Sequence, residues 1–129
     1  MEQQILQRNQ KGFTLVEIIT VLVLLSVLYA IAVPKYIELE QNAQQKVFDG
    51  AIAELNGRES LVWANLKISR TGYQDDAQLL LVVNHNLGTD YVWQSGHPLA
   101  AGGNLTFRAK TVTLNRTLSD VSKPAVWSR

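Results

Sequence analysis

A continuous apolar run near the N-terminus constrains this chain most. Residues 13–33, FTLVEIITVLVLLSVLYAIAV, are 21 residues with a single charge, Glu17. At about 1.5 Å per residue, a helix of this length spans roughly 30 Å, the thickness of a bilayer's hydrocarbon core. The core helix of a small domain rarely presents so long an apolar surface on every side. The run therefore predicts a single membrane span, and Arg8 and Lys11 before it predict a cytoplasmic N-terminus.

Glu17 is unusual in such a run. A carboxylate inside hydrocarbon costs on the order of 3 kcal/mol or more, and the run contains no basic residue that would pair with it. Cleavage after Gly12 would create a free α-amine on Phe13, four residues before Glu17 and about one helical turn away. The α-amine of a neighbouring molecule would also be able to reach Glu17. The charge pattern therefore predicts that the chain is processed.

The residues around this position resemble a known signature. Residues 11–18, KGFTLVEI, are similar to the cleavage and methylation motif of type IV pilins and pseudopilins. They include the Gly before the cut, a Phe after it, and a Glu at the fifth position of the mature chain. The apolar helix that follows, Pro34 and Tyr36 also fit the family pattern. The resemblance covers roughly residues 8–50.

The resemblance implies a sequence of events. A membrane aspartyl peptidase would remove residues 1–12 and methylate the amine of Phe13. The mature subunit would wait among the lipids of the bacterial inner membrane, until ATP-driven inner-membrane machinery assembles it with identical or related pilin subunits. The filament would reach the cell surface or span the periplasm. Within it, Glu17 would pair with the Phe13 amine of a neighbour, because an unpaired carboxylate in a low-dielectric core penalises misregistered subunits.

Competing interpretations fit the N-terminal residues less well. A secretory signal shares the basic start and has an A-x-A site at residues 30–32, but the apolar stretch is long for a signal core and Glu17 interrupts it. A plain single-span anchor leaves Gly12, Phe13 and Glu17 unexplained. We therefore expect a structural subunit of a type IV pilus. The alternatives are a pseudopilin of a type II secretion system and a membrane-anchored monomeric binding module.

The helical pattern continues beyond Pro34, which lacks a backbone donor and predicts a kink or a stop. Apolar residues recur at mostly four-residue spacing and predict an amphipathic continuation over residues 35–70. This stripe comprises Leu39, Ala43, Val47, Ala51, Leu55, Val62 and Leu66, with Phe48 and Ile52 alongside. We expect one helix of about fifty residues, kinked at Pro34. Gly50 and Gly57 weaken it by about 1 kcal/mol each, and indicate either close packing or a flexible point.

The last part of the chain, residues 71–129, changes character. Asp75 or Asp76 is placed to cap a short helix over residues 77–83, although the same apolar run also fits a buried strand. Candidate strands then follow at residues 90–93, 104–109 and 112–117, and the first two are separated by Gly96, Pro98, Gly102 and Gly103.

These elements predict an α+β, pilin-like fold, in which one long N-terminal helix packs on a small antiparallel sheet of three to four strands. The chain is expected to divide into a leader (1–12), a transmembrane and polymerisation helix (13–34), its amphipathic continuation (35–70) and a C-terminal globular part (71–129).

The remaining composition predicts no catalytic, metal or cofactor site. Twelve basic and eleven acidic residues give a net charge of +1, which provides no electrostatic reason to expect nucleic acid. The absence of cysteine excludes disulfides and thiolate chemistry. His85 and His97 have no second ligand at a metal-binding spacing and are expected in surface loops. For Asp75 and Asp76, capping explains the pair better than cation binding. The sequence therefore predicts that this protein is not an enzyme.

Overall fold

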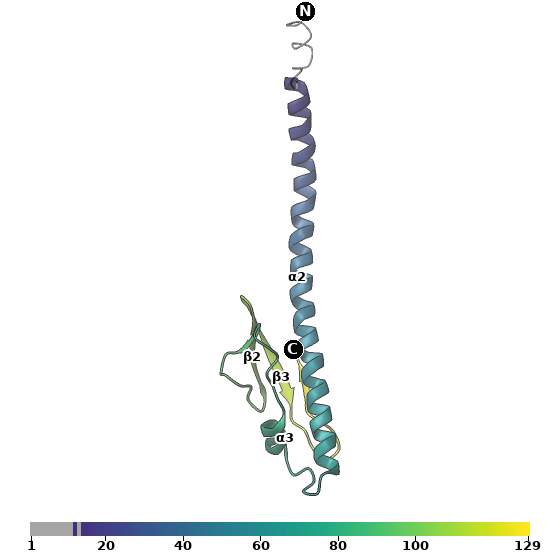
Figure 1. The fold of residues 1–129 in the computed structure, drawn as a ribbon, viewed down its shortest axis with the longest axis vertical. Helices are drawn as coiled ribbons and strands as arrows, with labels where there is room; N and C mark the ends of the chain where they lie inside the picture. Colours follow the sequence, from purple (N-terminus) through teal and green to yellow (C-terminus); the bar gives the residue numbers. More distant parts are fainter. Residues whose placement is uncertain (1–11, 13) are drawn as a thin grey trace, which may run out of the picture. The chain divides into compact units, whose positions relative to one another are not determined.

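The structure is a computed structural model, and it describes Gly12 and residues 14–129. The rest of the predicted leader and Phe13 lie outside the described residues. The chain forms two compact units, Met1–Ala43 and Gln44–Arg129, which are considered separately. The elements, drawn in Figure 1, are α2 (Leu15–Ile68), α3 (Asp76–Val82), β1 (Tyr91–Trp93), β2 (Gly102–Phe107), β3 (Lys110–Thr117) and β4 (Val126–Ser128). They confirm the predicted α+β pilin-like fold.

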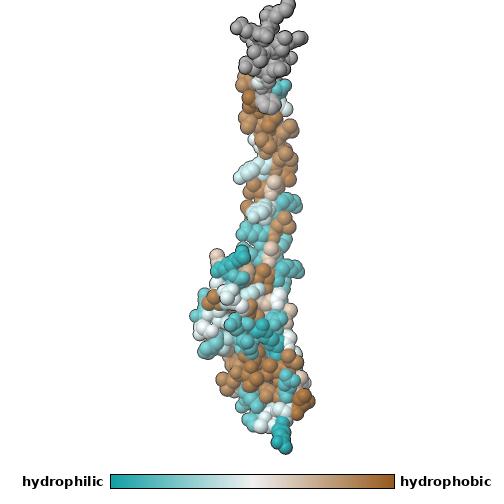
Figure 2. Space-filling view, in the orientation of Figure 1, coloured by the Kyte–Doolittle hydropathy of each residue, from teal (hydrophilic) through white to brown (hydrophobic). Residues whose placement is uncertain are grey.

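The first unit contains the N-terminal part of α2. Residues 14–32 are all exposed, and apolar side chains cover most of the face of this segment that Figure 2 shows. The helix is long and apolar enough to cross a membrane. Two hydroxyl side chains within the apolar run donate to carbonyls one turn back, Thr20 to Val16 and Ser26 to Leu22, both at 2.7 Å. Their donors are therefore satisfied without water. The helix continues through Pro34, so the predicted stop is wrong, and the kink stays a prediction.

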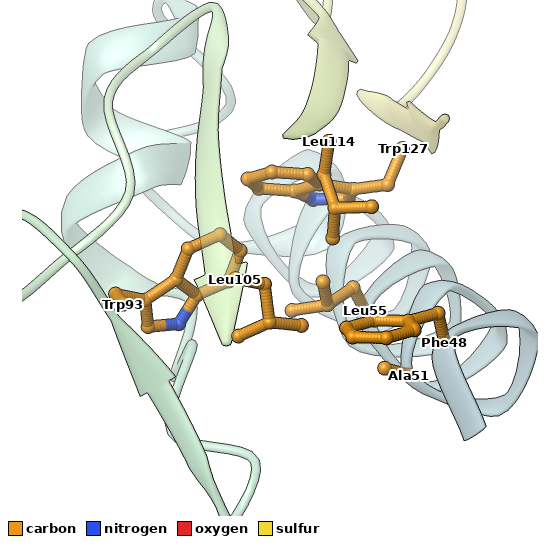
Figure 3. Close-up of a cluster of buried hydrophobic side chains, with 7 residues drawn as sticks. All are labelled: Phe48, Ala51, Leu55, Trp93, Leu105, Leu114 and Trp127. Carbon is orange, nitrogen blue, oxygen red and sulfur yellow. The ribbon is translucent and has the colours of Figure 1, made fainter. Parts of the chain in front are cut away.

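The second unit is built on a four-stranded antiparallel sheet in the order β1-β2-β3-β4. One face of the sheet packs against α2. Each strand places one large apolar side chain in the core beside three helix residues, and Figure 3 shows these side chains facing one another. The core consists of Phe48, Ala51 and Leu55 from α2 and Trp93, Leu105, Leu114 and Trp127 from the strands. The two tryptophan rings lie 5.5 Å apart, and the helix supplies nearly half of the cluster.

A smaller cluster joins α3 to the last turns of α2. Leu79, Val83 and Ala125 are buried there, against the partly buried Trp63 and Tyr73. The side chain of Asp75 caps α3 by accepting a hydrogen bond from the backbone N–H of Gln78 at 2.8 Å. The predicted helix is confirmed, and the alternative strand over the same residues is wrong.

The structure corrects two predictions about glycines. Close packing does not explain Gly50 and Gly57, because a Cβ at either position would meet nothing within 4 Å. Gly102 and Gly103, predicted in a loop, instead begin β2. Gly102 has a φ of +122°, and a Cβ there would collide with the carbonyl oxygen of Leu114. Only glycine fits this start of the strand without strain.

The C-terminal segment, which contains the unpredicted strand β4, lies along α2. The side-chain amide of Asn56 pairs with the backbone of Trp127 as another strand would. It accepts from the N–H at 2.6 Å and donates to the carbonyl at 3.1 Å. Further contacts run along the helix from Arg129 to Asp49 (3.0 Å), Trp63 to the Asp120 carbonyl (3.0 Å) and Lys67 to the Val121 carbonyl (2.7 Å). These contacts attach the C-terminal segment to α2.

Candidate functional site

Thr14 and Glu17 form a reciprocal cap at the start of α2. The backbone N–H of Thr14 donates to Glu17 Oε2 at 3.1 Å, and the N–H of Glu17 donates to Thr14 Oγ1 at 3.3 Å. This is the capping-box arrangement, in which two N–H groups without helical partners are satisfied. The helix dipole also favours a carboxylate in the first turn. The fold therefore places Glu17 where its charge is partly compensated within the chain.

The cap leaves Glu17 able to accept further hydrogen bonds. A carboxylate offers about four acceptor positions, and among the described residues the side chain accepts only from Thr14, through Oε2. Gly12 is exposed just before this cap. Phe13 lies outside the described residues, so the predicted cleavage bond and amine stay predictions.

Pro34, the other predicted assembly residue, does not lie near Glu17. The two are 17 positions apart in one helix, which at about 1.5 Å per residue is roughly 25 Å. Pro34 is exposed. The exposed pair Lys35 and Glu38, 3.7 Å apart, follows it directly. Pro34 therefore lies at the point where the apolar run ends and the first charged residues begin.

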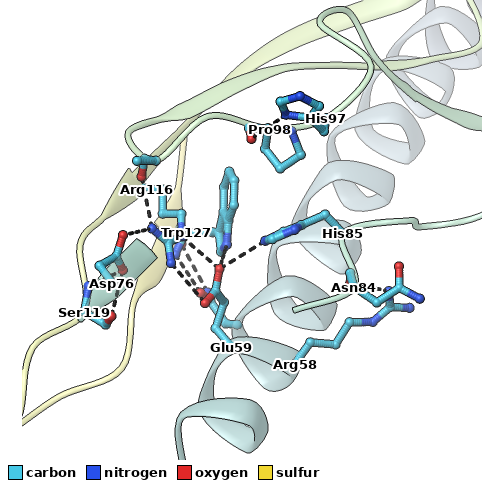
Figure 4. A network of polar contacts seen from close by, with 12 residues as sticks. Arg58, Glu59, Asp76, Asn84, His85, His97, Pro98, Arg116, Ser119 and Trp127 are labelled. Carbon is cyan, nitrogen blue, oxygen red and sulfur yellow. Dashed lines mark hydrogen bonds and ion pairs between the residues drawn. The ribbon is translucent and has the colours of Figure 1, made fainter. Parts of the chain in front are cut away.

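A second constellation, which the sequence did not reveal, lies in the core of the second unit. Glu59 of α2 is fully buried and accepts hydrogen bonds from three side chains, shown in Figure 4. Arg116 donates from Nε at 2.8 Å and from Nη2 at 3.2 Å, and Trp127 donates from Nε1 at 3.0 Å. His85 Nε2 lies 3.3 Å from Glu59 Oε1. Because an ionised carboxylate only accepts, His85 carries a proton on Nε2.

Arg116 extends this network to α3 and to the segment after β3. Its Nη1 donates to Asp76 Oδ2 at 2.7 Å and to the carbonyl of Ala100 at 3.1 Å. Asp76 Oδ1 in turn accepts from the backbone and side chain of Ser119, at 2.8 and 2.7 Å. Every buried side-chain nitrogen and oxygen in the described part of the chain has a hydrogen-bond partner. The network thus ties α2, α3, β3 and β4 together without a disulfide.

The network favours the ionised carboxylates. Burial on its own would raise the pKa of Glu59, but hydrogen bonds from His85 and Arg116, the charge of Arg116 and the Trp127 indole together hold the pKa below its ordinary value. Burial likewise opposes ionisation of Asp76, and Arg116 and Ser119 outweigh it, so that the pKa of Asp76 is also lowered. Burial disfavours the charge on Arg116, and the two carboxylates raise its pKa. The cluster therefore carries charged carboxylates and a charged guanidinium at neutral pH.

Two features of the sequence agree with this network, although neither was used to predict it. Glu59 lies one helical turn after Leu55 and interrupts the apolar stripe before Val62. Arg116 follows Val112 and Leu114 on the inward positions of β3. A charged residue at a position whose periodicity predicts burial indicates a buried partner.

The structure also settles the histidines and aspartates. His85 was predicted on the surface, which is wrong, because its side chain is 10% exposed and contacts Glu59. His97 is exposed, as predicted. Asp75 caps α3, and Asp76 pairs with Arg116. Over residue 12 and residues 14–129, no three His, Asp or Glu side chains are grouped as ligands of a metal ion.

Comparison with known proteins identifies the N-terminal segment. The family described as the prokaryotic N-terminal methylation motif matches residues 7–33, which include Gly12, Phe13 and Glu17. The chain is 35% identical over 57 residues to the type IV narrow pilus major component PilA5 of Thermus thermophilus. The alignment covers 44% of this chain and 49% of the relative, so the chain spans about half the length of the relative it matches. No solved structure matches the chain significantly.

The motif, the similarity and the fold agree with one another. The methylation motif lies where the apolar helix begins, and that helix packs its second half on a four-stranded antiparallel sheet. The relative is named as the major component of a pilus. The motif and the similarity to a pilus component support a type IV pilin family for this chain.

Proposed function

We propose that this protein is a structural subunit of a type IV pilus or related filament. It is cut between Gly12 and Phe13, methylated on the new amine and assembled through α2. The observation that carries the proposal is the methylation motif over residues 7–33, with Glu17 in the first turn of an exposed apolar helix. The relative is named as the major component of a pilus, which favours a pilus over a secretion pseudopilus.

Before assembly, the subunit lies in the inner membrane as a single span with a cytoplasmic N-terminus. Its partners at this stage are lipid, the prepilin peptidase and methyltransferase, and the assembly machinery. The apolar side chains of α2 contact lipid, and the cap with Thr14 reduces the cost of holding Glu17 there. Removal of residues 1–12 leaves an amine on Phe13 within about one turn of Glu17.

In the filament, the lipid around α2 is replaced by the helices of other subunits. Glu17 accepts from the Phe13 amine of a neighbour, through acceptor positions that the cap does not use. The low dielectric inside the helix bundle strengthens this pair and penalises a carboxylate without a partner. The pair thereby sets the axial register. Pro34 allows α2 to kink at the point where the apolar run gives way to charged residues.

The test compares Glu17→Ala and Glu17→Gln with the unchanged protein in cells that contain the peptidase and assembly machinery. Filaments sheared from the cells are quantified, together with subunit in the membrane fraction. We expect normal membrane levels and no detectable filaments for either variant. Glu38→Gln, an exposed carboxylate beyond the apolar run, serves as the matched control. Filament yields that match the unchanged protein would exclude the pairing mechanism. If the unchanged protein itself stays monomeric in the membrane fraction and forms no filaments, the binding-module alternative would be favoured.

A further inference from the structure

Asn56 and Gly57 of α2 form the only Asn-Gly pair in the sequence. In such a pair the backbone nitrogen of the glycine can attack the side-chain carbonyl carbon of the asparagine, because glycine has no Cβ to hinder the approach. Packing does not require this glycine, since Gly57 is exposed and a Cβ there would meet nothing within 4 Å. The pair is therefore chemically labile wherever the backbone is free to rearrange.

Two features of the fold keep the pair from reacting. In a helix each Cα–Cβ bond is tilted toward the N-terminus, so the Asn56 side chain points away from the nitrogen of the next residue. The side-chain amide is also held by β4. Its Oδ1 accepts from the Trp127 N–H at 2.6 Å, and its Nδ2 donates to the Trp127 carbonyl at 3.1 Å. Both polar atoms of the amide are therefore engaged while the last strand stays in place.

We propose that Asn56 is a latent deamidation site, which β4 protects in the folded chain and which reacts once this strand has detached. The nitrogen of Gly57 loses its proton and bonds to Cγ of Asn56. The Cγ–Nδ2 bond breaks, and ammonia leaves with that proton. Water then opens the resulting five-membered imide, adding its hydroxyl to one carbonyl carbon and its proton to the nitrogen. Opening at Cγ gives aspartate, and opening at the backbone carbonyl carbon gives isoaspartate.

Either product opposes the return of β4. In aspartate an oxygen replaces Nδ2, and an ionised carboxylate only accepts hydrogen bonds. Two acceptors would then face each other where the 3.1 Å bond to the Trp127 carbonyl now lies. In isoaspartate the backbone gains one carbon atom within α2, between Leu55 of the core and Glu59 of the network. Deamidation therefore makes a reversible detachment of the last strand permanent.

Peptide mass spectrometry of the full chain in detergent micelles tests the site. The chain is incubated in mildly alkaline buffer, with or without enough urea to unfold the globular part, and replacement of the Asn56 side-chain NH₂ by OH is followed over time. We expect conversion in urea and protection in its absence. Gly57→Ala should suppress conversion in urea. Asn65, an exposed residue of the same helix that is followed by Leu66, is the internal control and should stay unconverted in both conditions.

Two threonines of β3 test whether detachment of β4 exposes the site. Thr117 Oγ1 donates to the Val126 carbonyl at 3.0 Å, so Thr117→Val loosens β4. Loss of one hydrogen bond shifts such an opening equilibrium by about two- to tenfold, and conversion of Asn56 below the unfolding transition should accelerate by that factor. Thr113→Val instead loses a hydrogen bond of 2.8 Å to Asn104 of β2 and should leave this rate unchanged.

Three results would overturn the inference. Absence of conversion in urea would show that Asn56 is not a deamidation site. Equal rates in the folded chain and in urea would show that the fold does not protect it. Equal acceleration by Thr117→Val and Thr113→Val would show that global unfolding, rather than detachment of β4, exposes the amide. None of these results affects the proposed assembly through Glu17, which is tested separately by filament yield.

Discussion

Two glutamates of α2, Glu17 and Glu59, lie in opposite surroundings. Glu17 belongs to the exposed apolar segment, where only Thr14 among the described residues donates to its side chain. Glu59 is fully buried among donors from Arg116, Trp127 and His85. Each is a charged residue within an apolar stretch, and the helix alone satisfies neither.

The difference between them lies in where the missing donors come from. For Glu59 the fold supplies all of them from within one subunit, so its role is to hold that subunit together. For Glu17 the described part of the first unit supplies one donor, and in the proposed filament the Phe13 amine of a neighbour supplies another. We infer that the same chemical problem, a carboxylate removed from water, is solved by folding in one region and by assembly in the other.

The largest expected loss of stability comes from a substitution that breaks the network around Glu59. Glu59→Gln removes the negative charge that pairs with Arg116. Loss of one partner of a buried ion pair lowers the unfolding free energy by about 3–5 kcal/mol. Glu17→Gln, the matched change in the other region, should leave the unfolding free energy of the globular part unchanged. Urea unfolding of the full chain in detergent, followed by tryptophan fluorescence, measures both. Equal stability of the two variants would remove the distinction between the glutamates.

Acid should destabilise the globular part through the network around Glu59. The lowered pKa values of Glu59 and Asp76 give stability that is fully present above their ordinary values of 4.5 and 3.8. It is lost as the pH falls through the still lower values of the folded protein, because the unfolded state then binds more protons. The unfolding free energy, measured from pH 7 down to pH 3, should fall in this window. In Glu59→Gln the fall should be shallower, and an unchanged slope would show that Glu59 is not a source of the acid sensitivity.

A smaller effect is expected where β4 meets α2. Asn56→Ala removes both hydrogen bonds to the Trp127 backbone and leaves a half-buried N–H without a partner, at a cost of about 1–3 kcal/mol. Hydrogen exchange at the Trp127 amide should accelerate. The exposed Asn65 of the same helix gives the control, Asn65→Ala, which should change neither quantity. Retained protection at Trp127 in Asn56→Ala would mean that β3 alone holds the last strand.

The smallest effect concerns the cap of α2. Thr14→Ala removes the hydroxyl that accepts from the Glu17 N–H, which costs about 1 kcal/mol at a helix N-terminus. Amide exchange of residues 15–18 in micelles should accelerate in this variant. Thr20→Ala removes a hydroxyl that bonds one turn back inside the helix and should leave those amides unchanged. The same exchange rates in both variants would contradict the cap.

The two regions also differ in what the sequence discloses. The start of α2 depends on neighbours in sequence, such as Thr14 and Glu17, so the apolar run and the motif indicate it directly. The network joins Glu59 to Arg116, 57 residues away, and Arg116 to Asp76, 40 residues away. Periodicity indicates that Glu59 and Arg116 face inward, but not that they face each other. Strand β4 escaped prediction for a similar reason, because three residues held by Asn56 and β3 carry almost no local pattern.

The central claim is that cleavage after Gly12 creates the amine that pairs with the carboxylate of Glu17. Mass spectrometry of the N-terminal peptide, from subunits in the membrane fraction and in sheared filaments, tests it most directly. We predict a peptide that begins at Phe13 and carries one methyl group on its α-amine. A peptide that still begins at Met1, or one that begins at Val33 after cleavage at Ala32, would contradict the account.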